Sequence, residues 1–243
     1  KMITLKRGLQ TSNNWISAHL VLQIGAGRFA NFLNNSLDLK SHVEPVPPIC
    51  LGAMDVSISE MVSAYTAFAN KGIKASPLFV TRIEDNNGNV IATFVPRMKE
   101  VYNEETASKM ISLLQGVING GTGLRLRTKR YDYSLGWETP IAGKTGTTQN
   151  NSDGWFMGFV PSLVTGVWVG GEDRDIHFDN IRNGQGSASA LPIWGIFMNK
   201  VYNDSTLGYS RTEQFVTTQK YDCSSKDDQP IVGEAADELI LLD

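Results

Sequence analysis

The sequence PIAGKTGTTQNNSDGWFMGF, residues 140–159, contains the most unusual short motif of the chain, Gly-Lys-Thr-Gly-Thr at 143–147. Its first three residues look like the end of a phosphate-binding loop, whose first glycine would then fall at position 138. That position holds Glu138, and Pro140 lies inside the loop that would have to form. A carboxylate where backbone amides must surround a phosphate contradicts the chemistry of such a loop. We therefore interpret the motif as part of a strand.

Three predicted strands follow one another closely in this region, at residues 141–147, 155–160 and 163–170. Pro161 and Ser162 form the tight turn between the last two. Both faces of these two strands are apolar or glycine, which is typical of strands covered on both sides. We expect an α/β (α+β) fold, in which an antiparallel sheet is flanked by helices.

Helices and one hairpin are predicted from apolar spacing and from capping residues. The predicted hairpin, residues 79–94, turns at Asn86-Asn87-Gly88. Residues 41–55 and 126–139 are interpreted as loops, the second one polar. Helices are predicted at residues 4–10, 14–24, 26–37, 103–119 and 188–202, and from Ser57 or Ser59 to Asn70.

Composition limits the class of protein. The 243 residues allow one large domain or two small ones, and a hydrophobic share of 41% is enough for a sizeable core. A net charge of −3 argues against a nucleic-acid-binding protein. No apolar run reaches the roughly 18 residues that suggest a membrane-spanning helix. We expect no metal site and two unpaired thiols, because metal-ligand spacing is absent among Cys50, Cys223, His19, His42 and His177.

A second glycine motif, GAGRFA at residues 25–30, fits the pattern of a dinucleotide-binding fold, and Glu44 lies near the spacing of a ribose contact. However, residues 16–24 continue a helical period, whereas that fold requires a strand there. The would-be second strand is short, polar and ends in proline. We interpret Gly25-Ala26-Gly27 as a turn between two helices and keep a nucleotide-binding enzyme as an alternative hypothesis.

The strand motif at 143–147 contains residue types that acyl transfer from a peptide requires, namely groups that anchor the substrate and stabilise charge. Lys144 is a fixed cation that favours a substrate carboxylate and eases proton movement. Thr145 and Thr147 are two residues apart, so both point the same way from a strand and their hydroxyls can hold a terminal carboxylate. Gly146 lacks a side chain, so a substrate backbone can lie close against the strand.

A short polar triplet, Ser12-Asn13-Asn14, lies between two predicted helices, where a loop can aim side chains into a cleft. Ser12 can relay a proton to a leaving amine, and Asn14 can hold the substrate amide. The backbone N–H of Thr147 can supply half of an oxyanion hole. The candidate catalytic residues are therefore Ser12, Asn14 and Lys144, the candidate substrate-binding residues are Thr145, Gly146 and Thr147, and no cofactor is expected.

The triplet and the Lys-Thr-Gly strand belong to a set of motifs found in serine β-lactamases and penicillin-binding proteins, whose third member is Ser-x-x-Lys. From about Ile3 to about Met198, the chain resembles the transpeptidase domain of class A, bifunctional penicillin-binding proteins. The resemblance lies in the stretches ITLKRGLQTSNNWISAHLV, LGAMDVSISEMVSAYTAFANKGI, SPLFVTRIEDNNGNVI, LLQGVINGGTG and PIAGKTGTTQNNSDGWFMGFVPSLVTGVWVGG, the last with Asp153, Trp155 and Phe156 in the usual places.

The resemblance implies the cross-linking of peptidoglycan stem peptides. A serine would attack a D-Ala-D-Ala peptide, release D-Ala and pass the acyl group to an amine on a neighbouring stem. β-Lactams would acylate the same serine and contact the same strand. The implied location is extracytoplasmic, on the periplasmic side of the inner membrane.

One departure from the family pattern concerns the nucleophile. No serine of the chain is followed three places later by lysine; only Thr106 and Thr217 have this spacing, in the wrong regions. We expect residues 1–209 to be a partial transpeptidase domain and 210–243 to be a tail of uncertain structure. The missing segment, a glycosyltransferase domain and a membrane anchor would lie upstream in the parent protein, and the fragment alone would be inactive. The alternative is a non-catalytic peptide-binding or sensor domain.

Overall fold

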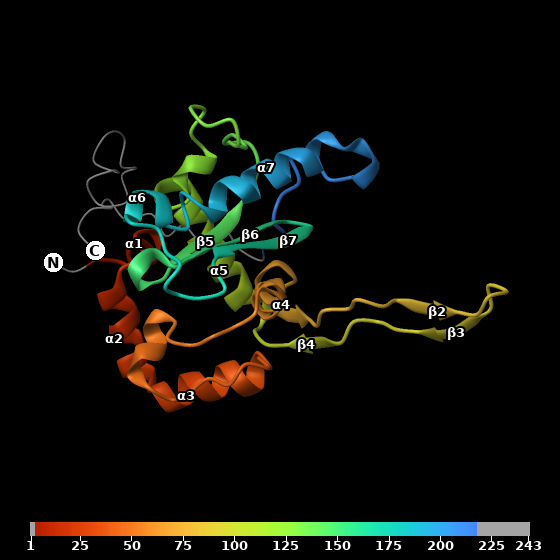
Figure 1. Cartoon of the computed structure of the whole chain (residues 1–243), viewed down its shortest axis with the longest axis horizontal. Coiled ribbons are helices and arrows are strands. Elements are labelled where there is room, and N and C mark those ends of the chain that lie inside the picture. The colour runs from red at the N-terminus through yellow and green to blue at the C-terminus, as the bar shows by residue number, and fades with distance from the viewer. Residues whose placement is uncertain (1–2, 218–243) are drawn as a thin grey trace.

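A three-stranded antiparallel sheet lies at the centre of the computed structural model, which describes residues 3–217 (Figure 1). Its strands, in spatial order, are β5 (Ala142–Thr147), β6 (Asp153–Val160) and β7 (Leu163–Gly170). Lys144 pairs with Met157 of β6, which in turn pairs with Gly166 of β7. The predicted antiparallel sheet and the turn at Pro161-Ser162 are confirmed.

Helices cover both faces of this sheet, as expected from the apolar character of its strands. Phe156 packs edge to face on Trp194 of α7 (Ala190–Asn203), with the ring centroids 5.2 Å apart. Phe159 points to the opposite face and packs against Tyr65 of α4 (Ile58–Ala69), at 6.3 Å. Two aromatic residues of one strand thereby connect the three layers of the fold.

The longest helix of the described residues, α5 (Glu104–Gly120), begins at Asn103, whose side chain caps it by accepting a hydrogen bond from the N–H of Thr106 at 2.8 Å. It lies on the same side of the sheet as α4 and packs on β5, while α1 (Leu5–Gln10) packs on α5 (Figure 1). Its buried residues include Ile111, Leu114, Val117 and Ile118. The amphipathic helix predicted at 103–119 is confirmed.

Two further N-terminal helices form a separate small core with the short 3-10 helix Pro47–Leu51, which interrupts the loop predicted at 41–55. The helix α2 (Asn14–Ile24) ends at Gly25, whose φ of 91° is easily reached only by glycine, and α3 (Ala26–Asn31) follows at once. A π-helical turn over Phe32–Ser36 completes the helix predicted at 26–37. The segment before Gly25 is therefore helical, which leaves no strand for a dinucleotide-binding motif.

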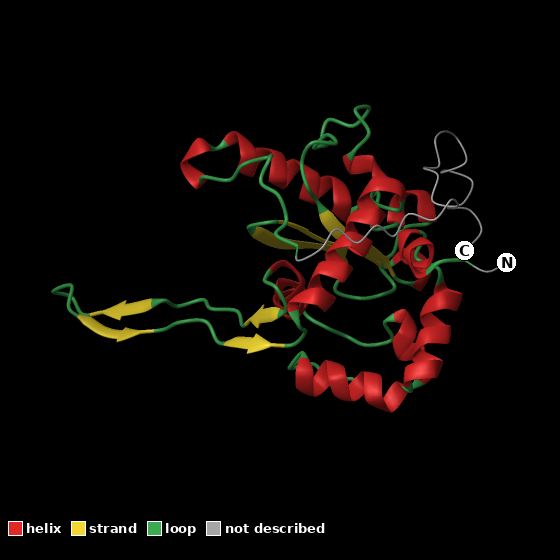
Figure 2. Ribbon diagram, turned by 180° about the vertical axis from the view of Figure 1, so that it is seen from behind, coloured by secondary structure: helices red, strands yellow, loops and turns green. Residues whose placement is uncertain are grey.

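A long antiparallel ribbon projects from the body of the molecule (Figure 2). Its base consists of β1 (Ile73–Ala75) and β4 (Met98–Glu100), and its outer part of β2 (Arg82–Glu84) and β3 (Val90–Thr93). The Asp85 carboxylate accepts hydrogen bonds from the N–H groups of Asn87 and Asn89 and so closes the turn. The predicted hairpin is confirmed.

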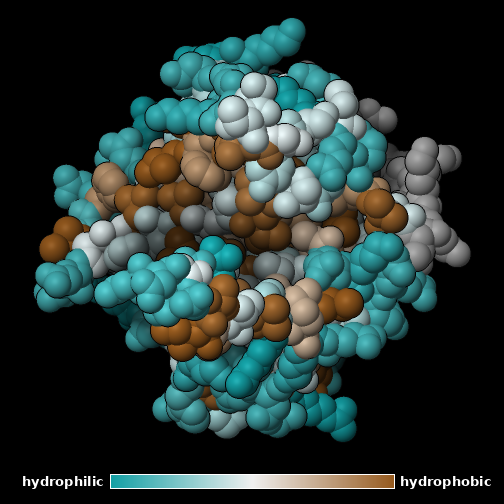
Figure 3. Space-filling view, turned by 90° about the vertical axis from the view of Figure 1, so that its right-hand side faces the viewer, coloured by the Kyte–Doolittle hydropathy of each residue, from teal (hydrophilic) through white to brown (hydrophobic). Residues whose placement is uncertain are grey.

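Apolar side chains are exposed along this ribbon, including Phe79, Ile91 and Val95. Seen from the end that carries the ribbon, apolar side chains gather in a band between hydrophilic regions (Figure 3). An isolated two-stranded ribbon is only marginally stable in water. Here β1 packs on α4 and pairs with β4, which connects the ribbon to the body.

The segment 126–139 forms the predicted loop, but part of this loop is buried. It begins with the last residue of a 3-10 helix, Leu124–Leu126, and contributes Tyr133 and Leu135 to the core under α7. Arg127 is also buried; its guanidinium donates to Asn119 Oδ1 at 2.9 Å and to the Thr139 carbonyl at 2.8 Å. Burial lowers the pKa of Arg127 to about 10, and nearby Glu138 opposes this shift. Satisfied hydrogen bonds explain why a charged residue of this loop lies inside the protein.

The last described residues pack on the domain. Phe215 contacts Phe159 at 5.6 Å, and Ser162 Oγ donates to Glu213 Oε2 at 2.6 Å. Cys50 is half-buried, whereas Cys223 and most of the predicted tail lie outside the described residues. Among residues 3–217, no helix combines the length and apolar character needed to cross a membrane. Short helical turns complete the described chain: α6 (Ile181–Gly184) and the 3-10 helices Gln149–Asn151 and Ser205–Leu207.

Candidate active site

Ser12 lies in the turn that joins α1 to α2. Its φ of 53° falls in the left-handed region, which is uncommon for a residue with a side chain. The turn is held by its neighbours, because the Thr11 hydroxyl donates to the Arg7 carbonyl at 2.9 Å and Asn13 Oδ1 accepts from the N–H of Ile16 at 3.2 Å. These bonds close one helix and open the next, and they aim the hydroxyl of Ser12 at β5.

Lys144 reaches Ser12 from β5. Its Nζ donates one hydrogen bond to Ser12 Oγ and another to the backbone carbonyl of Thr145, at 2.8 Å. Burial lowers the pKa of the Lys144 ammonium to about 8. Two motifs that are 132 residues apart in the sequence therefore meet through a direct side-chain contact.

Thr145 is buried, and its Oγ1 lies 2.6 Å from Oγ1 of Thr122. Thr122 follows the C-terminal end of α5, and its N–H donates to the carbonyl of Gln10 at 3.1 Å. Sequence reasoning interpreted the Gly-Gly-Thr-Gly stretch at 120–123 only as the end of a helix and missed Thr122. The threonine among three glycines was the available signal.

Thr147 and Gly146 contact different parts of the protein from Thr145. Thr147 is exposed, and its Oγ1 accepts a hydrogen bond from the N–H of Gly186 at 3.0 Å. The two threonine hydroxyls of β5 thus have different protein partners. A Cβ at Gly146 would lie 3.0 Å from Cβ of Trp155 on the paired strand, so packing inside the sheet already favours glycine at this position.

Asn14, by contrast, is exposed at the first position of α2, one residue after the helix cap. Among the described residues, its side chain makes no hydrogen bond to Ser12 or Lys144. The structure brings Ser12, Lys144 and Thr145 together and leaves Asn14 at the periphery of this group.

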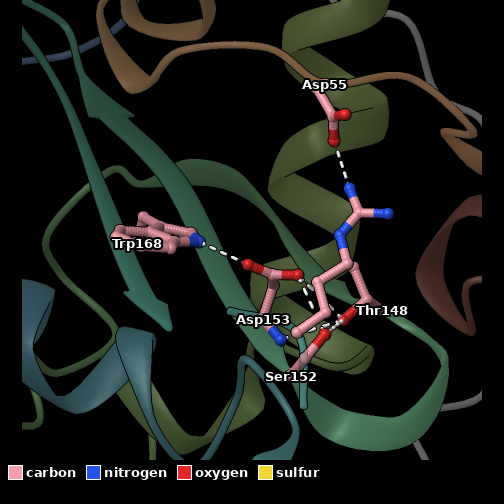
Figure 4. A network of polar contacts seen from close by, with 6 residues as sticks. Asp55, Thr148, Ser152, Asp153 and Trp168 are labelled. Atoms are coloured by element: carbon pink, nitrogen blue, oxygen red, sulfur yellow. Dashed lines mark hydrogen bonds and ion pairs between the residues drawn. The ribbon is translucent and has the colours of Figure 1, made fainter. Parts of the chain in front are cut away.

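A network of polar contacts holds the turn that follows β5 (Figure 4). Asp153 Oδ1 accepts from the indole Nε1 of Trp168 at 2.8 Å, and its Oδ2 accepts from the hydroxyls of Ser152 at 3.1 Å and Thr148 at 3.2 Å. These bonds connect the turn to β6 and β7. The end of β5 that carries Thr147 is thereby anchored to the sheet.

Comparison with known proteins identifies the family. Residues 47–176 match the family described as penicillin binding protein transpeptidase domain. This chain belongs to that family. The matched range contains the Lys-Thr-Gly strand of the transpeptidase domain, while Ser12 lies before it.

Curated proteins similar to this chain include several penicillin-binding proteins 1A. The chain is 32% identical over 199 residues to "Penicillin-binding protein 1A" of Aquifex aeolicus (strain VF5), covering 82% of this chain and 26% of that protein. The protein of the same name from Rickettsia prowazekii (strain Madrid E) is 29% identical over 225 residues, with 83% and 27% covered. The chain therefore spans about a quarter of the length of the curated relatives it matches.

Solved structures share the transpeptidase fold. Penicillin-Binding Protein 1A from Haemophilus influenzae superposes with a TM-score of 0.74 at 25% identity, over 83% of this chain and 34% of the other. Penicillin-binding protein PonA1 from Mycobacterium tuberculosis superposes with a TM-score of 0.73 at 23% identity, over 89% and 59%. The mixed α/β fold with its antiparallel sheet is that of penicillin-binding protein transpeptidase domains.

Proposed function

We propose that this chain forms the substrate-holding part of a peptidoglycan D,D-transpeptidase, which transfers the acyl group of a D-Ala-D-Ala stem peptide to an amine of a neighbouring stem. The contact between Lys144 Nζ and Ser12 Oγ carries this proposal. An ammonium group that donates a hydrogen bond to a serine hydroxyl suits a step in which that hydroxyl passes a proton to a leaving amine.

In this proposal each residue has a distinct role. Lys144 attracts the terminal carboxylate of the stem peptide, and Thr145 and Thr147 donate hydrogen bonds to it. Ser12 passes a proton to the nitrogen of the departing D-Ala. The backbone N–H of Thr147 stabilises the oxyanion that forms when the carbonyl is attacked. Gly146 leaves room for the backbone of the peptide, and Asn14 holds its amide.

The attacking serine is proposed to come from polypeptide outside these 243 residues, since no serine among them has a lysine three positions later. Its hydroxyl would add to the carbonyl carbon, expel D-Ala as the amine and form an ester, which the amine of the second stem would then cleave. Residues 1–209 are assigned to this domain. A glycosyltransferase domain, a membrane anchor and an extracytoplasmic location belong to the same proposal for the whole protein.

The proposal is tested on the full-length protein that contains this chain. We expect stoichiometric acylation by a fluorescent penicillin, and release of D-Ala from an acylated D-Ala-D-Ala peptide. Mass spectrometry should map the penicilloyl group to a serine of a Ser-x-x-Lys segment. A folded full-length protein that forms no adduct and releases no D-Ala would instead be a non-catalytic peptide-binding domain.

A further inference from the structure

The turn after α5 is held against the N-terminal part of the chain by hydrogen bonds and close packing. The N–H of Thr122 donates to the Gln10 carbonyl at 3.1 Å, and Gln10 Nε2 donates to the Gly116 carbonyl at 3.3 Å. A Cβ at Gly121 would collide with the backbone of Gln10. The position of Thr122 is therefore determined by backbone contacts with α1, the helix that precedes Ser12.

The side chain of Thr122 points from this turn to the strand motif, where its Oγ1 lies 2.6 Å from Oγ1 of Thr145. Either hydroxyl can donate in this pair. A carboxylate ligand, however, accepts hydrogen bonds and donates none. When Thr145 gives its proton to a carboxylate, the bond between the two threonines persists only if Thr122 is the donor.

We infer that Thr122 is a positioning residue for recognition of the free carboxylate of the substrate: its hydroxyl donates to Thr145 and so orients the Thr145 proton towards the ligand. This inference rests on the proposed function, because the carboxylate is the one that Thr145 is proposed to hold. A hydroxyl that accepts one hydrogen bond while donating another is polarised by it, which strengthens the bond to the anion.

The same residue connects the two halves of the candidate site. Its backbone is bonded to Gln10, two residues before Ser12, and its side chain to Thr145, one residue after Lys144. Loss of the hydroxyl alone leaves the backbone bond in place. Substitution therefore separates the effect on the carboxylate from the effect on the architecture.

The experiment uses the full-length protein and two probes, benzylpenicillin and its methyl ester, which differ only in the charged carboxylate. The measured quantity is the ratio of their second-order acylation rate constants. Thr122→Val should lower this ratio about 3- to 10-fold, the effect of one neutral hydrogen bond. Thr122→Ser keeps the hydroxyl and should restore the ratio. Thr128→Val, which removes an exposed threonine hydroxyl of the following loop, should leave it unchanged.

The controls separate positioning from folding. If Thr122→Val does not fold, Thr122→Ala removes the same hydroxyl with a smaller side chain. In a Thr145→Val background, the Thr122 substitution should lower the ratio no further. An unchanged ratio in folded Thr122→Val or Thr122→Ala, or an equal loss in Thr122→Ser, overturns the inference. If the unsubstituted protein reacts with neither probe, the proposed function itself fails and the inference falls with it.

Discussion

At the scale of single residues, the ammonium of Lys144 is held between Ser12 Oγ and the carbonyl of Thr145. Burial lowers its pKa to about 8, so the ammonium is still mostly protonated at neutral pH. It is therefore placed to act through its charge, and two substitutions and a pH profile test that role.

Replacing Lys144 in the full-length protein separates charge from shape. Lys144→Ala should reduce the penicillin acylation rate by about 10²–10³, as loss of one preorganised donor typically does. Lys144→Arg should rescue little, because a planar guanidinium does not replace a compact ammonium. Lys129→Ala, at an exposed loop position, is the matched control. Normal acylation in Lys144→Ala would mean that this lysine has no part in catalysis.

The pH dependence follows from the lowered pKa of Lys144. As the pH rises through about 8, the ammonium loses its proton, and the preference for benzylpenicillin over its methyl ester should decline. The effect of the same pKa shift on folding stability has the opposite sign. In the unfolded chain the pKa of Lys144 has its ordinary value of 10.5, so between about pH 8 and 10.5 the unfolded chain binds more protons than the folded protein. The contribution of Lys144 to stability therefore rises with pH in this range. The check is the ratio of the two acylation rates from pH 6 to about 10. A flat ratio in the unsubstituted protein would contradict the assignment.

At the scale of elements, the N-terminal cap of α4 combines residues of the helix itself with backbone groups of a loop distant in the sequence. Ser57 and Glu60 form a capping box, which identifies Ser57, rather than Ser59, as the N-cap. Glu60 Oε1 also accepts from the N–H groups of Lys40 and Ser41, both at 2.7 Å. Burial would raise the pKa of Glu60, but the hydrogen bonds from Ser41 and Ser57 outweigh it and hold the pKa at about 2.

Removing this cap should loosen α4 locally. Ser57→Ala should cost about 1 kcal/mol, the usual value for an N-cap, and raise amide exchange of residues 58–69 roughly fivefold. Ser59→Ala is the control within the same helix.

The capping box is also sensitive to pH. Because the pKa of Glu60 is depressed, the stabilising contribution of Glu60 is present above about pH 4.5 and is lost as the pH falls towards 2. Hydrogen exchange measured by mass spectrometry in the full-length protein gives the answer, and equal exchange in both variants would refute the cap's role.

At the scale of the whole molecule, three segments far apart in the sequence converge: the α1–α2 turn, the turn after α5, and β5. The α5 helix links them, since it packs on both α1 and β5 (Figure 1). The central sheet is covered on both faces, so this convergence depends on the domain core as well as on the three segments. In the proposed function, this convergence brings together the groups that would hold the substrate and move a proton.

The 243-residue polypeptide by itself should form no covalent adduct with penicillin. The Ser12 hydroxyl accepts a hydrogen bond from the cationic Lys144, and a serine hydroxyl without a neighbouring base is a weak nucleophile at neutral pH. Intact-mass measurement after incubation with the drug gives the result, and circular dichroism with a cooperative melt must show that the polypeptide is folded. A stoichiometric adduct on Ser12 would mean that its role as a proton relay is wrongly assigned.

Local sequence signals were sufficient for most elements. The helix over Asn14–Ile24, the hairpin and the antiparallel strands were predicted because caps, turns and apolar periodicity act between near neighbours in the chain. The motifs also indicated the family, since Lys144-Thr145-Gly146 and the Ser12 triplet are short sequence motifs with a defined chemistry. The loop predicted at 126–139 is present, but its polar sequence did not reveal that part of it is buried, because hydrogen bonds made across the fold allow the charged Arg127 to lie inside.

The contacts that define the candidate site depend on packing across the whole domain. Nothing in the local sequence indicates that the Thr145 hydroxyl pairs with Thr122, that Thr147 bonds Gly186, or that Asn14 remains at the periphery. The depressed pKa of Lys144 likewise arises from burial by elements distant in the chain. The amino-acid sequence by itself determined which residue types and local turns are available. Their distances and desolvation exist only once α1, α5 and β5 pack together, because those quantities depend on neighbours in space.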